Sequence, residues 1–178
     1  MKATGIVRRI DDLGRVVMPK EIRRTMRIRE GDPLEIYTNS DGEIIFKKYS
    51  PIGELSSFSA QYAEALNKVG GLPAMICDRD HVVAVAGIPK KEMMERRLST
   101  EMENALEHRK TVIMSEEEEK IKPVDGNERH IAVSCPILAA GDVTGAVMFV
   151  SADDKKVDEA QVKLIQAAAL FLGKQMEA

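Results

Sequence analysis

The sequence predicts a mixed α/β protein built from two domains, a small β-rich domain over residues 1–50 and a larger α/β domain over residues 51–178. Two observations carry this prediction. Short strand-like runs fill the first fifty residues, whereas helical stripes and strands alternate in the rest. The charge divides at the same place, because the overall net charge of −3 combines a basic head with an acidic body. With 44% apolar and 31% charged residues, the 178-residue chain has the composition of a globular protein.

The first domain is predicted to run strand, strand, helix, strand, strand. The turn sequence Asp11-Asp12-Leu13-Gly14 separates the first two strands, and Asn39-Ser40-Asp41-Gly42 separates the last two. Pro19 suits the first position of the short helix, on which Ile22 and Met26 share one face. The four strands are expected over residues 5–10, 15–18, 34–38 and 43–47.

A domain of this size buries little surface when it is alone. Chains below about 60 residues are marginal, and this one has no disulfide or metal ligands and a single phenylalanine, Phe46. Sharing the core with a second copy is the simplest remedy. We therefore expect an obligate dimer, in which interdigitated hairpins also cover the edges of the short strands.

The second domain begins after the linker-like sequence Tyr49-Ser50-Pro51. Apolar residues at helical spacing predict a helix over 52–69, which ends at Gly70-Gly71. A long helix over 155–176 has apolar residues in two rows and is expected to contact more than one neighbour. Between these helices we expect hairpins over 74–86 and 131–150, a helical region over 90–109 that is broken near Ser99-Thr100, which serves as an N-cap, and a short strand over 111–114.

The positive charge is concentrated at the N-terminus. Residues 1–29 hold 9 basic and 3 acidic residues, whereas residues 51–178 hold 15 basic and 21 acidic ones. This asymmetry favours contact between the head and a polyanion, although a solvated basic face is the alternative for any arginine cluster. Guanidinium groups suit phosphate oxygens and the acceptor edge of guanine.

The head resembles the AbrB family of transition-state regulators. The resemblance covers residues 2–50 and depends on the run GRVVMP at 14–19, the basic run EIRRT at 21–25, and the hairpin sequences LEIY and IIFKKY. It implies a swapped-hairpin β-barrel, an intertwined dimer that binds double-stranded DNA with relaxed specificity based partly on duplex shape. The residues that match the family's DNA-contacting positions are Arg8, Arg15, Arg23 and Arg24, with Arg9 where a basic residue is usual.

The body is similar in its order of elements to a GAF domain, an α/β/α fold that senses small molecules. The signature of cyclic-nucleotide-binding GAF domains is absent, so that ligand class is disfavoured and the effector is unknown. A purely structural, oligomerising body is the alternative. The two predicted helices over 52–69 and 155–176 are where we expect the bodies to associate, which would allow a homotetramer.

The body shows no pattern of catalytic or metal-binding residues. Cys77 and Cys135 lie in apolar strands and are interpreted as core residues. His81, His108 and His130 lack metal-ligand spacing and are expected in turns or on the surface. The acidic run 116–119 is interpreted as a solvated loop. We therefore expect no cofactor, no metal and no enzyme activity.

The leading hypothesis is a cytoplasmic transcriptional regulator that activates or represses its targets and does not contact a membrane. An antitoxin is the alternative, since AbrB-like heads also occur in antitoxins, but those usually end in a short tail that wraps the toxin. A methionine sulfoxide reductase on a GAF fold is the third possibility, and it would need paired reactive cysteines. No apolar run approaches the ~20 residues that span a bilayer.

Overall fold

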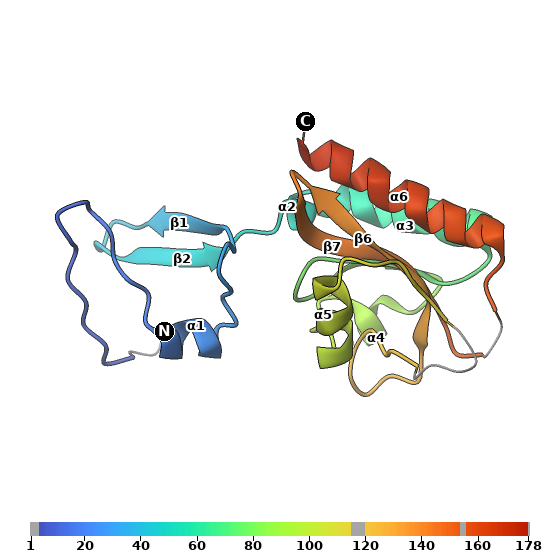
Figure 1. The fold of residues 1–178 in the computed structure, drawn as a ribbon, viewed down its shortest axis with the longest axis horizontal. Coiled ribbons are helices and arrows are strands. Elements are labelled where there is room, and N and C mark those ends of the chain that lie inside the picture. The colour runs from blue at the N-terminus through green and yellow to red at the C-terminus, as the bar shows by residue number, and fades with distance from the viewer. Residues whose placement is uncertain (1–3, 115–119, 154–155, 178) are drawn as a thin grey trace. The chain divides into compact units, whose positions relative to one another are not determined.

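The computed structural model describes residues 4–114, 120–153 and 156–177, which form two units (Figure 1). The first unit comprises Met1–Tyr49 and the second Ser50–Ala178. Each unit is a separate body with its own arrangement of elements. Within the described ranges, no helix is long and apolar enough to cross a membrane.

The turn predicted near the N-terminus is confirmed, but the two strands predicted beside it are wrong. The Asp11 backbone N–H donates to the Arg15 carbonyl at 3.0 Å, and Gly14 takes the positive φ of 77° that this turn requires. Residues 5–10 and 15–18 form no strand in the described chain. A strand needs hydrogen bonds to a neighbouring strand. The backbone hydrogen bonds that the described chain forms here, Asp11 to Arg15 and Gly14 to Asp11, only close the turn between the two segments.

Helix α1 (Lys20–Thr25) follows, with Pro19 as its N-cap rather than its first residue. The helix ends in a Schellman arrangement. The Ile28 N–H donates to the Arg23 carbonyl at 2.7 Å and the Arg27 N–H to the Arg24 carbonyl at 3.2 Å. Arg27 occupies the left-handed position with φ 49°, where glycine is more usual. The chain therefore leaves the helix at Met26, before it reaches Gly31.

Strands β1 (Leu34–Thr38) and β2 (Ile44–Lys48) form the predicted antiparallel hairpin. The Asn39 side-chain oxygen accepts from the backbone N–H groups of Asp41 and Glu43 and fixes the turn. Ile36 lies opposite Phe46 in the register.

The first unit has almost no interior of its own. Pro19 is the only residue that is buried in its described part. Val7 is 89% exposed, Val17 74% and Ile36 61%. Ile36, Phe46 and Ile44 share one uncovered face of the hairpin, since Ile36 pairs with Phe46 and Thr38 with Ile44.

The second unit is organised around an antiparallel sheet of five strands in the order β4-β3-β7-β6-β5. Irregularities in the register interrupt the ladders that join β3 to β4 and β6 to β7. The two long strands β6 and β7 form the centre with β3, and β4 and β5 lie at the edges. The strands are β3 (Ala74–Cys77), β4 (Val82–Ala86), β5 (Val112–Ile113), β6 (His130–Ala139) and β7 (Asp142–Ser151).

Helices cover both faces of this sheet, as predicted. One face packs against α2 (Pro51–Glu54), α3 (Ser56–Gly70) and α6 (Glu159–Glu177), and the other against α4 (Lys90–Met93) and α5 (Thr100–Glu107) (Figure 1). Successive strand residues serve the two cores alternately, because side chains alternate across a strand. In β3, Ala74 and Ile76 join the first core, and Met75 and Cys77 the second.

The helix boundaries follow local signals. Ser99 is the N-cap of α5, and its Oγ accepts from the Met102 N–H at 3.0 Å. Helix α6 begins at Glu159, a few residues later than expected, and Asp158 accepts from the Gln161 N–H at 2.7 Å just before its first turn.

Candidate nucleic-acid interface

The five predicted DNA-binding arginines all lie exposed on the first unit. Arg8 and Arg9 precede the Asp11–Gly14 turn, and Arg15 follows it. Arg23 and Arg24 lie in the last turn of α1. Positive side chains are stabilised there because the free carbonyl groups at the end of a helix carry partial negative charge. The two segments are joined through Pro19, so the five guanidinium groups belong to one basic stretch of chain.

Arg15 is held in place by Asp11. One Asp11 carboxylate oxygen accepts from the backbone N–H groups of Leu13 (3.0 Å) and Arg15 (2.7 Å). The other accepts from the Arg15 Nε at 2.9 Å. The bond from the Arg15 backbone N–H, followed by that from its side chain, lowers the pKa of Asp11. Sequence reasoning missed this positioning role, although an aspartate four residues before an arginine across a glycine turn is a usable signal.

Arg27, four residues after Arg23, does not belong to α1. It lies beyond the end of α1 in a left-handed conformation, so it is not one helical turn above Arg23 on the same face.

Two lysines of the hairpin contact other residues of the first unit. Lys47 lies 4.5 Å from the centre of the Tyr37 ring, and Lys48 lies 3.9 Å from the Asp32 carboxylate.

The residues of the second unit that were set aside as non-catalytic are mostly where the sequence placed them. Cys77 is fully buried, and burial raises the pKa of its thiol. Cys135 is partly buried, with the Thr111 hydroxyl at 3.5 Å from its sulfur. His81 and His108 are exposed, but His130 is buried, so the surface position expected for it is wrong. His130 begins β6 and lies opposite Ser151, the last residue of β7, at the end of the ladder between these strands.

Metal binding finds no support in the described ranges, where no three histidine, cysteine or acidic side chains are grouped to hold an ion. The acidic run 116–119 lies outside the described residues.

An aromatic cluster, formed by Phe58, Tyr62 and Phe171, connects helices α3 and α6. The ring centres of Phe58 and Phe171 lie 6.0 Å apart, and that of Tyr62 lies within 5.8 Å of each. Phe171 is 43% exposed, and the neighbouring Leu170 is 67% exposed. The cluster therefore presents apolar surface on the outer side of these helices.

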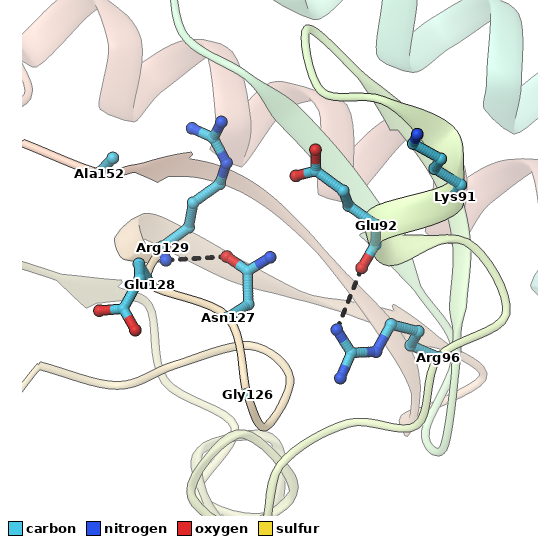
Figure 2. A pocket seen from close by; sticks show the side chains of 8 residues that line it. All are labelled: Lys91, Glu92, Arg96, Gly126, Asn127, Glu128, Arg129 and Ala152. Atoms are coloured by element: carbon cyan, nitrogen blue, oxygen red, sulfur yellow. Dashed lines mark hydrogen bonds between the residues drawn. The ribbon is translucent and has the colours of Figure 1, made fainter.

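A polar recess opens on the side of the sheet that carries α4 (Figure 2). It has a volume of about 520 Å³. Its polar lining comes from α4 and the turn after it and from the loop before β6, through Lys91, Glu92, Arg96, Asn127, Glu128 and Arg129. None of these residues was singled out from the sequence.

The described residues thus form a basic unit with exposed apolar faces and an α/β/α unit with its own two cores, the arrangement of a two-domain nucleic-acid-binding protein. The family model described as "Stage V sporulation protein T C-terminal, transcription factor" matches residues 54–177. Stage V sporulation protein T of Bacillus subtilis (strain 168) is 49% identical over 179 residues, which cover 99% of each chain. The chain belongs to this family and is a DNA-binding transcriptional regulator.

The head has relatives of its own. The transition state regulatory protein AbrB of Bacillus subtilis (strain 168) is 63% identical over 51 residues, which cover 29% of this chain and 52% of AbrB. This similarity confirms the AbrB-type head. The model for the MazE antitoxin matches residues 7–54, but the match to the transcription-factor family extends over the rest of the chain. The antitoxin alternative is therefore not favoured.

The body is similar to a solved GAF structure. The crystal structure of a GAF domain/HD domain protein from Geobacter sulfurreducens superposes with a TM-score of 0.52 and is 14% identical. The alignment covers 68% of this chain and 91% of that one. At this level of identity the likeness concerns the fold, and it confirms the predicted GAF-like architecture.

Proposed function

We propose that two N-terminal units form an intertwined dimer that binds duplex DNA through Arg8, Arg9, Arg15, Arg23 and Arg24. The observation that carries the proposal is the combination, in one unit, of exposed guanidinium groups with apolar side chains that have no interior to enter. A second copy would cover the face of Ile36, Ile44 and Phe46 and supply partners for residues 5–10 and 15–18.

The mode of binding follows from the chemistry of arginine. Four of the positions, Arg8, Arg15, Arg23 and Arg24, would give eight guanidinium groups in a dimer. If all eight contact phosphates, log affinity falls against log salt with a slope of roughly −7. The head offers no long recognition helix, since α1 spans only Lys20–Thr25. Specificity is therefore expected to depend partly on the shape and deformability of the duplex.

The second unit is proposed to join two such dimers. Helices α3 and α6 carry the aromatic cluster and Leu170 on their outer side, and a second body packed there would bury this surface. The resulting homotetramer would hold two DNA-binding dimers of the first unit on one core. The same unit is proposed to sense a small molecule, which would shift these helices only if it binds two conformations with different affinity.

The regulator is proposed to act in the cytoplasm in a sporulation programme and to have no enzyme activity. Its relatives over the full chain and over the head carry the names of a sporulation protein and a transition-state regulator. The fully buried thiol of Cys77 and the apolar setting of the second core disfavour thiol chemistry there.

The test is the loss of DNA binding without the loss of the fold. Arg23→Ala and Arg24→Ala are expected to weaken binding at least about tenfold each in a gel-shift assay at moderate salt. Both side chains are exposed, so circular dichroism and the oligomeric state should stay unchanged. Ser40→Ala, an exposed position on the same unit, is the control because it changes no charge. Full binding by both arginine variants would remove α1 from the interface.

A further inference from the structure

Two hydrogen bonds of Arg96 connect the elements that line the recess beside α4. Arg96 donates from one guanidinium nitrogen to the Glu92 carbonyl at 3.2 Å and from another to the Asp125 carbonyl. These two bonds connect α4 to the loop that precedes β6, across a wide gap in sequence. Because both acceptors are neutral carbonyls, the positive charge of Arg96 remains at the recess without a carboxylate to balance it.

Two further donors come from the loop before β6. The side-chain oxygen of Asn127 accepts from the Arg129 backbone N–H at 2.9 Å, which fixes the amide so that its nitrogen is the group left to donate. Figure 2 shows this nitrogen turned toward Glu92 and Arg96. Arg129 is half-buried, and its guanidinium has no hydrogen-bonded or ion-paired partner within the described part of the chain.

The carboxylates do not balance these donors. In Figure 2 the Glu128 carboxylate points away from the other lining side chains, whereas that of Glu92 lies on the same side as the Arg129 guanidinium. Neither is within ion-pair distance of Arg129 in the described structure. Lys91 adds a third cation at the rim. The recess therefore offers two guanidinium groups, an ammonium and an amide N–H against one acceptor.

We propose that this recess binds a small anionic metabolite through a carboxylate or phosphate group, with Arg129 as its main ligand. Guanidinium groups bind both oxyanions in a bidentate manner, and the Asn127 amide and Lys91 supply further donors. Glu92 would accept from a hydroxyl or ammonium group of the same molecule. The inference rests on the proposed sensing role of the second unit and names the chemical class that the unit senses.

The test uses the full chain without DNA and two probes, orthophosphate and succinate. Each anion is added in increasing concentration, at constant ionic strength set with sodium chloride. The melting temperature of the protein and the heat of binding by calorimetry are measured. At ten times its dissociation constant, the anion that fits should raise the melting temperature of the second unit by about 3–5 °C. Succinamide, the neutral isostere of succinate, should have no effect. A response to succinate alone identifies a carboxylate site, and a response to phosphate alone identifies a phosphate site.

Three variants locate the response. Arg129→Gln should raise the dissociation constant at least about tenfold, because it removes a charge-assisted bidentate bond. Lys68→Gln removes one exposed charge from α3, on the opposite face of the sheet, and should leave the response unchanged. Arg24→Gln, in the head, should also leave it unchanged.

The inference is overturned if neither anion binds at concentrations up to about 10 mM, which is above the range of ordinary affinities for metabolites. It is also overturned if Arg129→Gln responds like the unaltered chain, or if the response disappears with Arg24→Gln, which would place the anion on the head. Each of these results leaves the gel-shift test of the head unaffected, so the two proposals fail separately.

Discussion

The two units of this chain solve the problem of a core in opposite ways. The second unit buries Phe149, Met148 and Ile76 completely, and it covers both faces of its sheet with its own helices. The first unit leaves Val7, Ile36 and Phe46 exposed and buries only Pro19 among its described residues. The comparison shows that a domain can form its own turns, helix and hairpin and still need a second copy of the chain to bury its apolar side chains.

The largest expected effect is on the stability of the second unit, which forms its cores within one chain. Phe149→Ala removes a fully buried ring from the central strand β7 and should lower the free energy of unfolding of the second unit by about 3–5 kcal/mol. Urea denaturation of the full chain measures it. Val69→Ala, at an exposed site on α3, is the control and should change stability by less than about 0.5 kcal/mol. A loss below 1 kcal/mol for Phe149→Ala would contradict the two-core arrangement.

The next effect sharpens the comparison in the head. Phe46 is 46% exposed in one chain, so truncating it would matter little if the unit were a monomer. In a shared core, Phe46→Ala should raise the dissociation constant of the dimer by more than about a hundredfold. Sedimentation of the full chain over a dilution series measures it.

The matched control for that experiment is Ser40→Ala, an exposed polar position in the turn of the same hairpin, outside the face of Ile36, Ile44 and Phe46. It should leave the assembly unchanged. Equal assembly by the Phe46 and Ser40 variants would place the dimer contact elsewhere.

The assembly of the second unit gives a smaller effect on stability but a clear change in mass. Phe171→Ser on the aromatic cluster should convert tetramers to dimers, because it places a polar group in the proposed contact between bodies. The DNA-binding heads should remain paired, since their proposed contact lies in the first unit and not on α3 or α6. Light scattering distinguishes the two masses, and an intact tetramer would argue against α3 and α6 as the contact.

The smallest effect concerns the turn that holds Arg15. The pKa of Asp11 lies below its ordinary value of 3.8, first because of the Arg15 backbone N–H and then because of the Arg15 side chain. Arg15→Gln should raise this pKa only partly, since the backbone bond remains. A lowered pKa in the folded state stabilises the turn above the ordinary pKa, and this stability is lost as pH falls through the folded value. The turn should therefore be unaffected between pH 5 and 8.

Titration of the Asp11 carboxyl by NMR measures this change. Asp12 is the control, because it neighbours Asp11 but is not bonded to Arg15 by any contact in the described structure. A pKa of Asp11 that stays fixed in Arg15→Gln would show that the guanidinium contributes nothing to the turn.

The sequence predicted the features that depend on local residues. The turn at 11–14, the hairpin over 34–48 and a cap near Ser99-Thr100 follow from turn and capping chemistry. The arrangement of helices on both faces of the sheet is instead implied by the similarity of the order of elements to a GAF domain. The missing strands at 5–10 and 15–18 show the limit of that reasoning. A strand pattern specifies which residues suit a strand, but the partner that completes the ladder is a property of the whole assembly.

The recess and the burial of His130 could not be predicted for a related reason. Arg96 and Asp125 meet only because α4 and the loop before β6 lie on the same side of the sheet. Both groups that accept from Arg96 are backbone carbonyls. Every residue has one, so the sequence does not indicate which residues will accept. His130 is a single polar residue at the start of an apolar strand, and nothing in its spacing indicates that its neighbours cover it.

The salt dependence of binding to a non-specific duplex tests the central account most directly, because all contacts to such a duplex are with phosphates or sugars. Arg24→Gln removes one guanidinium from each chain. If two heads clasp the duplex together, the slope of log affinity against log salt should become shallower by about 1.8, twice the contribution of one phosphate contact. A change of about 0.9 would mean that a single head binds, and an unchanged slope would mean that Arg24 does not touch the backbone of DNA.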